Sequence, residues 1–280
     1  MHRRVCPCLW LLPLAVACGG RTDGSPSPDP LGSAGFWIKS SVPAAGSTSG
    51  GSFTVAAEFL RPGATSCATS TIGACTINPC LSPPPAVTGS DVTDAGQVTV
   101  VTSTTTAAIE PETDGDYATQ TFDVAPWMAG GESITVAWAH FPGSTTQTGG
   151  TFVAGTPPYV TLSPGSPFAD PTSTLDRTAD LTFSWTSDTA PASTDLLGVY
   201  FDSGSTQVGC NFDASAGTGV VPAAALQTLG AGAGSFDIHS KRVTSENLTA
   251  GDGSTWSFGF NVDAYARTSY GVATGKVTFR

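Results

Sequence analysis

Residues 255–262 have the sequence TWSFGFNV, and this stretch decides the fold class. Trp256, Phe258, Phe260 and Val262 fall on one side of an extended chain, and the small or polar residues between them fall on the other. A period of two residues is typical of a β-strand that packs one face on a core and turns the other to water. The stretch therefore predicts an antiparallel sheet.

The same alternation recurs at residues 53–59, 134–138 and 181–185, and stretches rich in Gly, Ser and Pro separate these runs. Short strands at such spacing predict a β-sandwich. The only helix that we expect is a turn or two at residues 222–229, where Pro222 can begin a helix and Gly230 can end it.

A weak internal repeat relates residues 122–136 to residues 219–238, since each has a strand, a Pro, a small apolar segment, a Gly-rich turn and another strand. We therefore expect an all-β protein with two antiparallel immunoglobulin-like sandwiches in tandem, at residues 34–155 and 156–280.

The composition restricts the partners. The chain has 280 residues, 40% hydrophobic and 12% charged, with 11 Lys and Arg against 22 Asp and Glu. That hydrophobic share is too high for disorder, and the length suits two domains. With three lysines and a formal net charge of −11, the chain lacks the basic footprint of a nucleic-acid-binding protein. We therefore expect no nucleic-acid partner.

Residues 1–17 have the layout of an export signal, because Arg3 and Arg4 precede an apolar run that is too short to span a bilayer. The sequence LAVAC at residues 14–18 resembles the lipobox of bacterial lipoproteins, although that family prefers Leu where this chain has Ala15. The resemblance implies that Cys18 is acylated and becomes the new N-terminus. An ordinary secretory signal is the alternative.

The lipoprotein resemblance also implies a place in the cell. Residues 18–33 are rich in Pro, Gly and Ser and predict a flexible tether. Gly19 follows the cysteine where inner-membrane lipoproteins of enterobacteria carry Asp, which by resemblance implies outer-membrane sorting. We therefore expect a lipid-anchored protein of the outer membrane, with its membrane contact at Cys18.

Three cysteines, Cys67, Cys75 and Cys80, lie close together, and Cys210 stands apart. An exported chain can keep disulfides, so we expect one bridge inside the triplet, either Cys67–Cys75 or Cys67–Cys80. Cys210 shares a strand face with apolar residues, which favours a buried free thiol; a bridge from Cys210 to the triplet is the alternative. The triplet, followed by VGCNF at residues 208–212, resembles uncharacterised exported lipoproteins of myxobacterial type.

No set of residues predicts an enzyme. His140 and His239 favour a loop edge and a solvated strand end, and the nucleophile elbow of serine hydrolases does not occur. The carboxylates of residues 110–116 could bind calcium, but a solvated loop is the favoured interpretation. We expect no metal site and no cofactor.

Among the tryptophans, Trp127 is the candidate ligand contact, because it lies in the irregular segment 125–131; the alternative is packing under a loop. Trp37, Trp138, Trp185 and Trp256 lie in alternating runs, which favours the core.

These observations favour a non-enzymatic, lipid-anchored surface protein with a structural or binding role. A carbohydrate- or protein-binding adhesin module is the second hypothesis, with an extracellular protein or glycan as partner. An uncharacterised hydrolase is the third.

Overall fold

A computed structural model describes residues 32–42, 50–60, 69–78, 94–113, 115, 117–142, 148–168 and 172–280. In this part of the chain the protein is nearly all β, with one short α-helix, α1 (Ala223–Leu226), and a 3-10 turn at Ala214–Ala216. The predicted all-β sandwich class is confirmed, and α1 lies inside the expected helical segment. No helix among the described residues is long and apolar enough to cross a bilayer.

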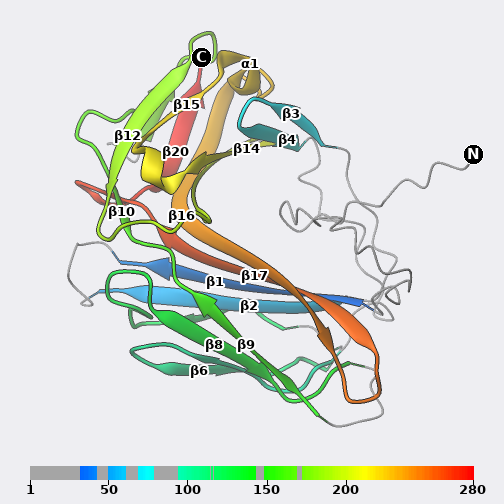
Figure 1. The fold of residues 1–280 in the computed structure, drawn as a ribbon. Helices are drawn as coiled ribbons and strands as arrows, with labels where there is room; N and C mark the ends of the chain where they lie inside the picture. The colour runs from blue at the N-terminus through cyan, green and yellow to red at the C-terminus, as the bar shows by residue number, and fades with distance from the viewer. Residues whose placement is uncertain are drawn as a thin grey trace, which may run out of the picture.

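One long sheet joins the upper and lower parts of Figure 1, and its strand β16 runs from the upper part into the lower, where β17 lies beside β1. Nine strands follow the order β3-β4-β14-β13-β16-β17-β1-β2-β7; β20 pairs with β16, and β11 pairs with β20. The strands of this long sheet are β1 (Gly32–Ser41), β2 (Ser52–Leu60), β3 (Ser70–Ile72), β4 (Cys75–Asn78), β7 (Gln120–Phe122), β11 (Thr172–Leu175), β13 (Asp195–Ser203), β14 (Thr206–Asp213), β16 (Gly232–Thr249), β17 (Thr255–Tyr265) and β20 (Thr274–Phe279).

Two smaller sheets complete the sandwiches. The first, in the lower part of Figure 1, has the order β6 (Thr106–Ile109), β5 (Val98–Val101), β8 (Ser133–Trp138), β9 (Gly150–Gly155). The second, in the upper part, has the order β15 (Thr218–Val221), β12 (Leu181–Ser187), β10 (Val160–Leu162), β18 (Arg267–Thr268), β19 (Gly271–Val272). Most neighbouring strands are antiparallel, as expected, but β1 and β17, β10 and β18, and β11 and β20 are parallel pairs.

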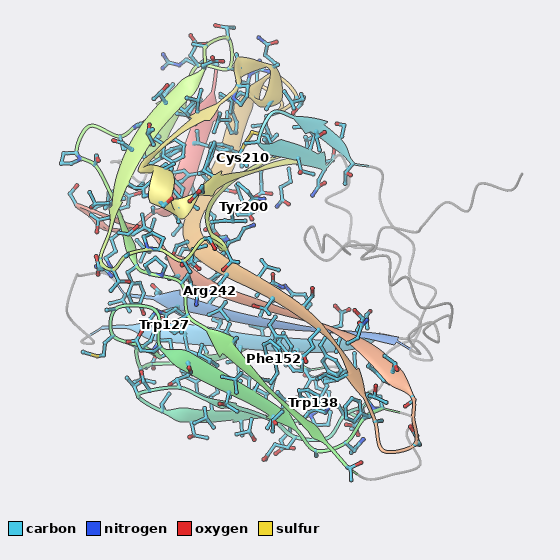
Figure 2. All side chains as sticks on the ribbon, viewed as in Figure 1. Trp127, Trp138, Phe152, Tyr200, Cys210 and Arg242 are labelled. Carbon is cyan, nitrogen blue, oxygen red and sulfur yellow. A yellow bond between two sulfur atoms is a disulfide. The ribbon has the colours of Figure 1, made fainter. Side chains whose placement is uncertain are left out.

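Two hydrophobic cores lie on one face of the long sheet, which we call the inner face. The N-terminal core takes side chains from residues 34–159 and from residues 250–264. In it Phe152 of β9 stacks on Phe260 of β17 with ring centroids 3.7 Å apart, and Trp138 of β8 stacks on Phe258 at 4.5 Å. Figure 2 shows Trp138 and Phe152 between these strands.

The C-terminal core takes its side chains from residues 160–279 and from Cys75 and Ile77 of β4. The two cores thus separate close to the expected boundary at residue 155, but each receives strands from the other half. The hairpin β16–β17 completes the N-terminal sandwich, and the hairpin β3–β4 extends the C-terminal one. The predicted tether also ends earlier than expected, because β1 begins at Gly32.

Between the two cores the inner face carries polar side chains, which we call the junction. Arg242 of β16 donates two hydrogen bonds to the fully buried carboxylate of Asp195, at 2.6 and 2.8 Å. Ser240 donates to the carbonyl of Pro158, and the hydroxyls of Ser40 and Tyr159 lie 2.7 Å apart. The junction therefore joins the long sheet to the segment that links the two halves of the chain.

Candidate functional site

The opposite face of the long sheet, the outer face, carries a cluster of charged and aromatic side chains. Its members are Lys39, Tyr200, Asp237, His239, Lys241, Asp263 and Tyr265, which we call the outer-face cluster. They come from four neighbouring strands, β1, β13, β16 and β17.

Strand alternation places these side chains on one face. On β16, Phe236 and Ile238 point into the C-terminal core, so Asp237, His239 and Lys241 point to the other side. The register then brings in the neighbouring strands, because Lys39 is paired with Asp263, Asp263 with Lys241, and Tyr200 with Asp237. The cluster is therefore fixed by backbone pairing between strands far apart in the sequence.

His239 lies at the centre of the cluster and is only 6% exposed. Its Nδ1 lies 3.0 Å from Asp237 Oδ1, and its Nε2 lies 3.6 Å from Asp263 Oδ2. Lys39 Nζ donates to Asp237 Oδ2 at 2.6 Å and lies 4.3 Å from the ring centre of Tyr265. The predicted solvated strand end for His239 is wrong, since the histidine is buried between two carboxylates.

Tyr200 needs two glycines to fit on the outer face. A Cβ on Gly198 would lie 2.6 Å from Tyr200 Cε2, and a Cβ on Gly209 would lie 2.9 Å from Cε1. The imidazole of His239 stacks on this ring at 4.9 Å, and Lys241 Nζ donates to the tyrosine hydroxyl at 2.6 Å. Figure 2 labels Tyr200 beside the upper part of β16.

Burial and charge shift the ionisation of the cluster. Burial would lower the pKa of Lys39, but the charge and hydrogen bond of Asp237, together with the charges of Tyr265 and Asp263, outweigh burial and raise this pKa. Burial would raise the pKa of Asp237, but the hydrogen bond and charge of His239, together with Lys39, hold it below its usual range. For Lys241 burial prevails over the charge of Asp263 and lowers the pKa to about 8. Burial raises the pKa of both Tyr200 and Tyr265.

Two acceptor atoms on the β17 part of the outer face lack a partner. Asn261 Oδ1 and Asp263 Oδ1, both on β17, are buried and make no hydrogen bond. Asn261 is 5% exposed and is paired in register with Trp37 of β1, which is partly exposed. Buried polar atoms in folded proteins nearly always have partners, so these two acceptors require an explanation.

The cluster has charged, hydrogen-bonding and stacking groups. Among the residues that the structure describes, no three His, Cys, Asp or Glu side chains are placed to hold a metal ion. The carboxylate segment 110–116, for which a solvated loop was favoured over a calcium site, is only partly described, because Asp114 and Asp116 lie outside the described residues. There Glu110 accepts a hydrogen bond from the amide of Gln97.

The disulfide differs from the predicted one. Cys75 is bonded to Cys210, with the Cα atoms 3.9 Å apart, and the two residues are direct partners in the pairing of β4 with β14. The predicted bridge Cys67–Cys75 and the predicted free thiol at Cys210 are therefore wrong. The alternative, a bridge from Cys210 to the triplet, is the one that the structure contains. Cys67 and Cys80 lie outside the described residues, as does Cys18.

Trp127, the predicted ligand contact, is 1% exposed and belongs to the N-terminal core. Its ring stacks on Tyr159 at 5.7 Å. The loop that carries it is held down by Glu132, whose carboxylate accepts hydrogen bonds from the backbone N–H groups of Met128, Ala129 and Gly130 at 2.9, 3.2 and 2.7 Å. The alternative, packing under a loop, is what the structure shows.

Sequence reasoning missed the outer-face cluster, although the sequence carries one signal for it. In DIHSK, residues 237–241, charged or titratable residues occupy every second position, which marks the non-core face of a strand. The expectation of core positions for the other tryptophans holds for Trp138, Trp185 and Trp256, all 3% exposed or less, but not for Trp37.

Comparisons with known proteins leave the family open. No family model matches the chain, and no curated protein matches it. Among solved structures, a chain from a study of host cell surface retention of a 1.5-MDa bacterial ice-binding adhesin is 12% identical, with a TM-score of 0.22. The match covers 84% of this chain and 65% of that chain. At this TM-score the likeness supports no conclusion about fold or function.

Proposed function

We propose that this protein is a non-enzymatic lipoprotein of the outer membrane that binds an extracellular protein or glycan through the outer face of its long sheet. The observation that carries the binding role is the position of Trp37 and the outer-face cluster on the outer face. Trp37, Lys39 and Tyr265 are partly exposed aromatic or charged side chains on a sheet face that neither hydrophobic core uses. Aromatic side chains beside a few convergent polar groups are typical of binding surfaces.

The membrane anchor in this proposal is Cys18, and it rests on the lipobox-like sequence at residues 14–18. Several acyl chains hold a protein on a membrane far more firmly than one chain does. The acidic chain, with a formal net charge of −11, would itself be repelled by an anionic surface, so the lipid must provide the attachment.

The anchor is tested with the variant Cys18→Ala in the full chain. We expect this variant to lose its fatty acid and to leave the detergent phase on partitioning. Cys8→Ala is the matched control, because Cys8 lies in the same apolar run and should leave lipidation unchanged. If Cys18→Ala still partitions with membranes, the lipoprotein proposal fails.

The binding role is tested by purifying the tagged full chain from native outer membranes after crosslinking. We expect a crosslinked partner with the wild type that is reduced with the double variant Trp37→Ala/Tyr265→Ala. Val153→Ala is the control, since Val153 is 62% exposed and lies on β9, in the separate four-stranded sheet. Identical partners for all three proteins would favour a structural spacer over an outer-face binding protein.

A further inference from the structure

The strand β16 continues beyond the end of its neighbour β13 and leaves part of its edge unpaired. β13 pairs with β16 only from Ser235 to Arg242, whereas β17 pairs along the other side of β16 as far as Thr249. Figure 1 shows β16 running down into the lower part of the molecule. Within the part of the chain that the structure describes, residues 243–249 therefore have a strand on one side only, and we call this stretch the open edge.

Alternate residues point their backbone groups out of the open edge. At its two ends, the pairing of β16 with β17 continues in hydrogen bonds of Ala250 N–H with the carbonyl of Ser254 and of Ala266 N–H with the carbonyl of Ile238, at 2.8 and 2.9 Å. Even-numbered residues of β16 thus face β17, and the backbone groups of the odd-numbered ones face the other way. Four residues of the open edge therefore point their N–H and C=O groups away from β17: Val243, Ser245, Asn247 and Thr249.

These groups are accessible and have no partner among the described residues. No strand pairs with them, and no hydrogen bond of the described loops or turns reaches them. Ser245, Asn247 and Thr249 are exposed, and no residue of the open edge is buried. An exposed row of unpaired N–H and C=O groups is a template on which another chain can pair.

The spacing of these groups selects the chemistry of the ligand. Residues that point the same way along a strand are about 7 Å apart, and each of them offers one donor and one acceptor. An extended polypeptide backbone repeats its own donor and acceptor at that spacing. In strand addition of this kind the main-chain hydrogen bonds provide affinity, and the side chains provide specificity.

Glu246 gives the open edge its specificity. It is the only charged residue of this stretch, it is exposed, and it makes no ion pair within the described part of the chain. Its pairing with Phe258 places its side chain on the inner face, at the rim of the N-terminal core. Opposite charges on directly paired residues stabilise a sheet, and like charges destabilise it. A Lys or Arg on the added strand, opposite Glu246, is therefore favoured.

Charge also disfavours a second copy of this chain as the occupant. Two copies of β16 paired antiparallel around Glu246 would bring the two carboxylates opposite each other. The formal net charge of −11 adds a repulsion between whole molecules.

We infer that the open edge binds an extended segment of another protein by antiparallel strand addition, with a Lys or Arg of that segment opposite Glu246. The added strand continues the line of β13 and extends the long sheet over the N-terminal sandwich. This site is separate from the outer-face cluster, because it uses the backbone edge of the sheet and not the side chains of Lys39, Tyr200 or Tyr265.

The test measures binding of a labelled synthetic peptide to the full-length purified protein by fluorescence anisotropy. The peptide consists of threonines with a central lysine and one valine two positions away on each side, and it is long enough to span residues 243–249. We expect it to bind. The same peptide with glutamate in place of lysine should bind about fivefold more weakly, because a like-charge pair replaces an opposite-charge pair.

N-methylation of the peptide tests the backbone contacts directly. With the lysine opposite Glu246, the N–H groups of its two neighbours point toward β16, so methylating both should weaken binding about tenfold or more. The N–H of the lysine itself points away, so methylating that nitrogen should leave the affinity nearly unchanged.

Variants of the protein separate the open edge from the outer face. Ser245→Pro removes an N–H that points out of the sheet, so it should keep the pairing with β17 and the unfolding midpoint but bind the lysine peptide about tenfold more weakly or worse. Ser245→Ala keeps the N–H and is the matched control. Glu246→Lys should reverse the preference between the two peptides, an effect that misfolding does not produce. Trp37→Ala/Tyr265→Ala should bind like the wild type.

Amide hydrogen exchange followed by NMR locates the bound peptide. In the free protein the amides of Val243, Ser245 and Asn247 should exchange fast, and those of Thr244 and Glu246 slowly. The peptide should slow the exchange of the first group.

The inference is wrong if the lysine peptide does not bind, or if Ser245→Pro binds it as well as the wild type. Binding that Trp37→Ala/Tyr265→Ala loses and Ser245→Pro keeps would place the peptide on the outer face, which supports the proposed function and rejects the open edge. A wild-type dimer in sedimentation that Ser245→Pro converts to a monomer would show that a second copy occupies the edge, and this too would overturn the inference.

Discussion

Trp185 shows, at the scale of single residues, how far strand alternation can be trusted. Its side chain is 3% exposed, its ring centre lies 5.4 Å from that of Phe183, and its indole N–H donates to the carbonyl of Ala214 at 2.8 Å. We expect Trp185→Ala to lower the free energy of unfolding by about 3–5 kcal/mol, as for other buried aromatics. Denaturant titration checks this, with Trp37→Ala as a control that should cost clearly less because Trp37 is partly exposed.

Lys241 makes a pH-dependent prediction at the same scale. Its pKa falls to about 8 on burial, against 10.5 for an unburied lysine, so between pH 8 and 10 the unfolded chain binds more protons than the folded one. Stability contributed by this residue must therefore rise with pH across that window. At pH 7 the free energy of unfolding of Lys241→Met should be up to about 3 kcal/mol higher than that of the wild type. The stability of the variant should also lack the rise between pH 8 and 10.

The measurement is urea unfolding of both proteins at pH 7 and pH 9.5. A wild-type gain between these pH values that Lys241→Met retains in full would show that another group causes it. The groups facing Lys241 are Tyr200 and Asp263, and Tyr200, whose pKa is raised, opposes the gain only near and above pH 10.

The residue scale also shows where prediction from the sequence stops. The alternation around Phe258 correctly predicts which face of this strand packs on the core, because a period of two residues is a local property of the chain. The sequence around His239 predicts a solvated strand end, because the residues that bury this side chain, among them Tyr200 and Asp263, come from other strands. Pairing partners such as Lys39 and Asp263 are more than 200 positions apart, and no local pattern specifies that register.

At the scale of elements, the loop before β8 depends on one carboxylate. Burial would raise the pKa of Glu132, but hydrogen bonds from the backbone N–H groups of Met128, Ala129, Gly130 and Glu132 itself together outweigh burial and lower this pKa. A depressed carboxyl pKa adds stability above the unfolded pKa, and this stability is lost as the pH falls through the folded pKa. We expect Glu132→Gln to cost about 1–2 kcal/mol at pH 7 and little at pH 3, measured by thermal unfolding.

The hairpin β3–β4 is held to β14 by the disulfide Cys75–Cys210, which links positions 135 residues apart. A bridge that closes so long a loop removes much conformational freedom from the unfolded chain. From the sequence this pairing is only an alternative, because cysteine spacing does not show that β4 pairs with β14.

The double variant Cys75→Ala/Cys210→Ala should be about 2–5 kcal/mol less stable than the oxidised wild type. Guanidinium titrations with and without reductant give the comparison. Under reducing conditions the two proteins should come close together, and an equal difference in both conditions would mean that packing of the sulfur atoms, not the bond, provides the stability.

At the scale of the whole molecule, the shared long sheet determines how the two halves unfold. β16 and β17 remain paired from His239–Tyr265 to Thr249–Thr255. β16 contributes side chains to both cores and to the junction between them, and β17 contributes to the N-terminal core. In that junction Arg242 is the cation that neutralises the fully buried Asp195. Two sandwiches joined only by a linker would unfold separately, whereas a common sheet couples them.

We therefore expect the wild type to unfold in one calorimetric transition, with equal calorimetric and van't Hoff enthalpies. Arg242→Met should lower the free energy of unfolding by about 3–5 kcal/mol, because it leaves a buried carboxylate unpaired at the point of coupling, and should broaden or split the transition. Lys276→Met is the matched control, since this exposed lysine on β20 lies outside the junction and its loss should leave a single transition. Two separated transitions in the wild type would show that the cores fold independently and that the long sheet does not couple them.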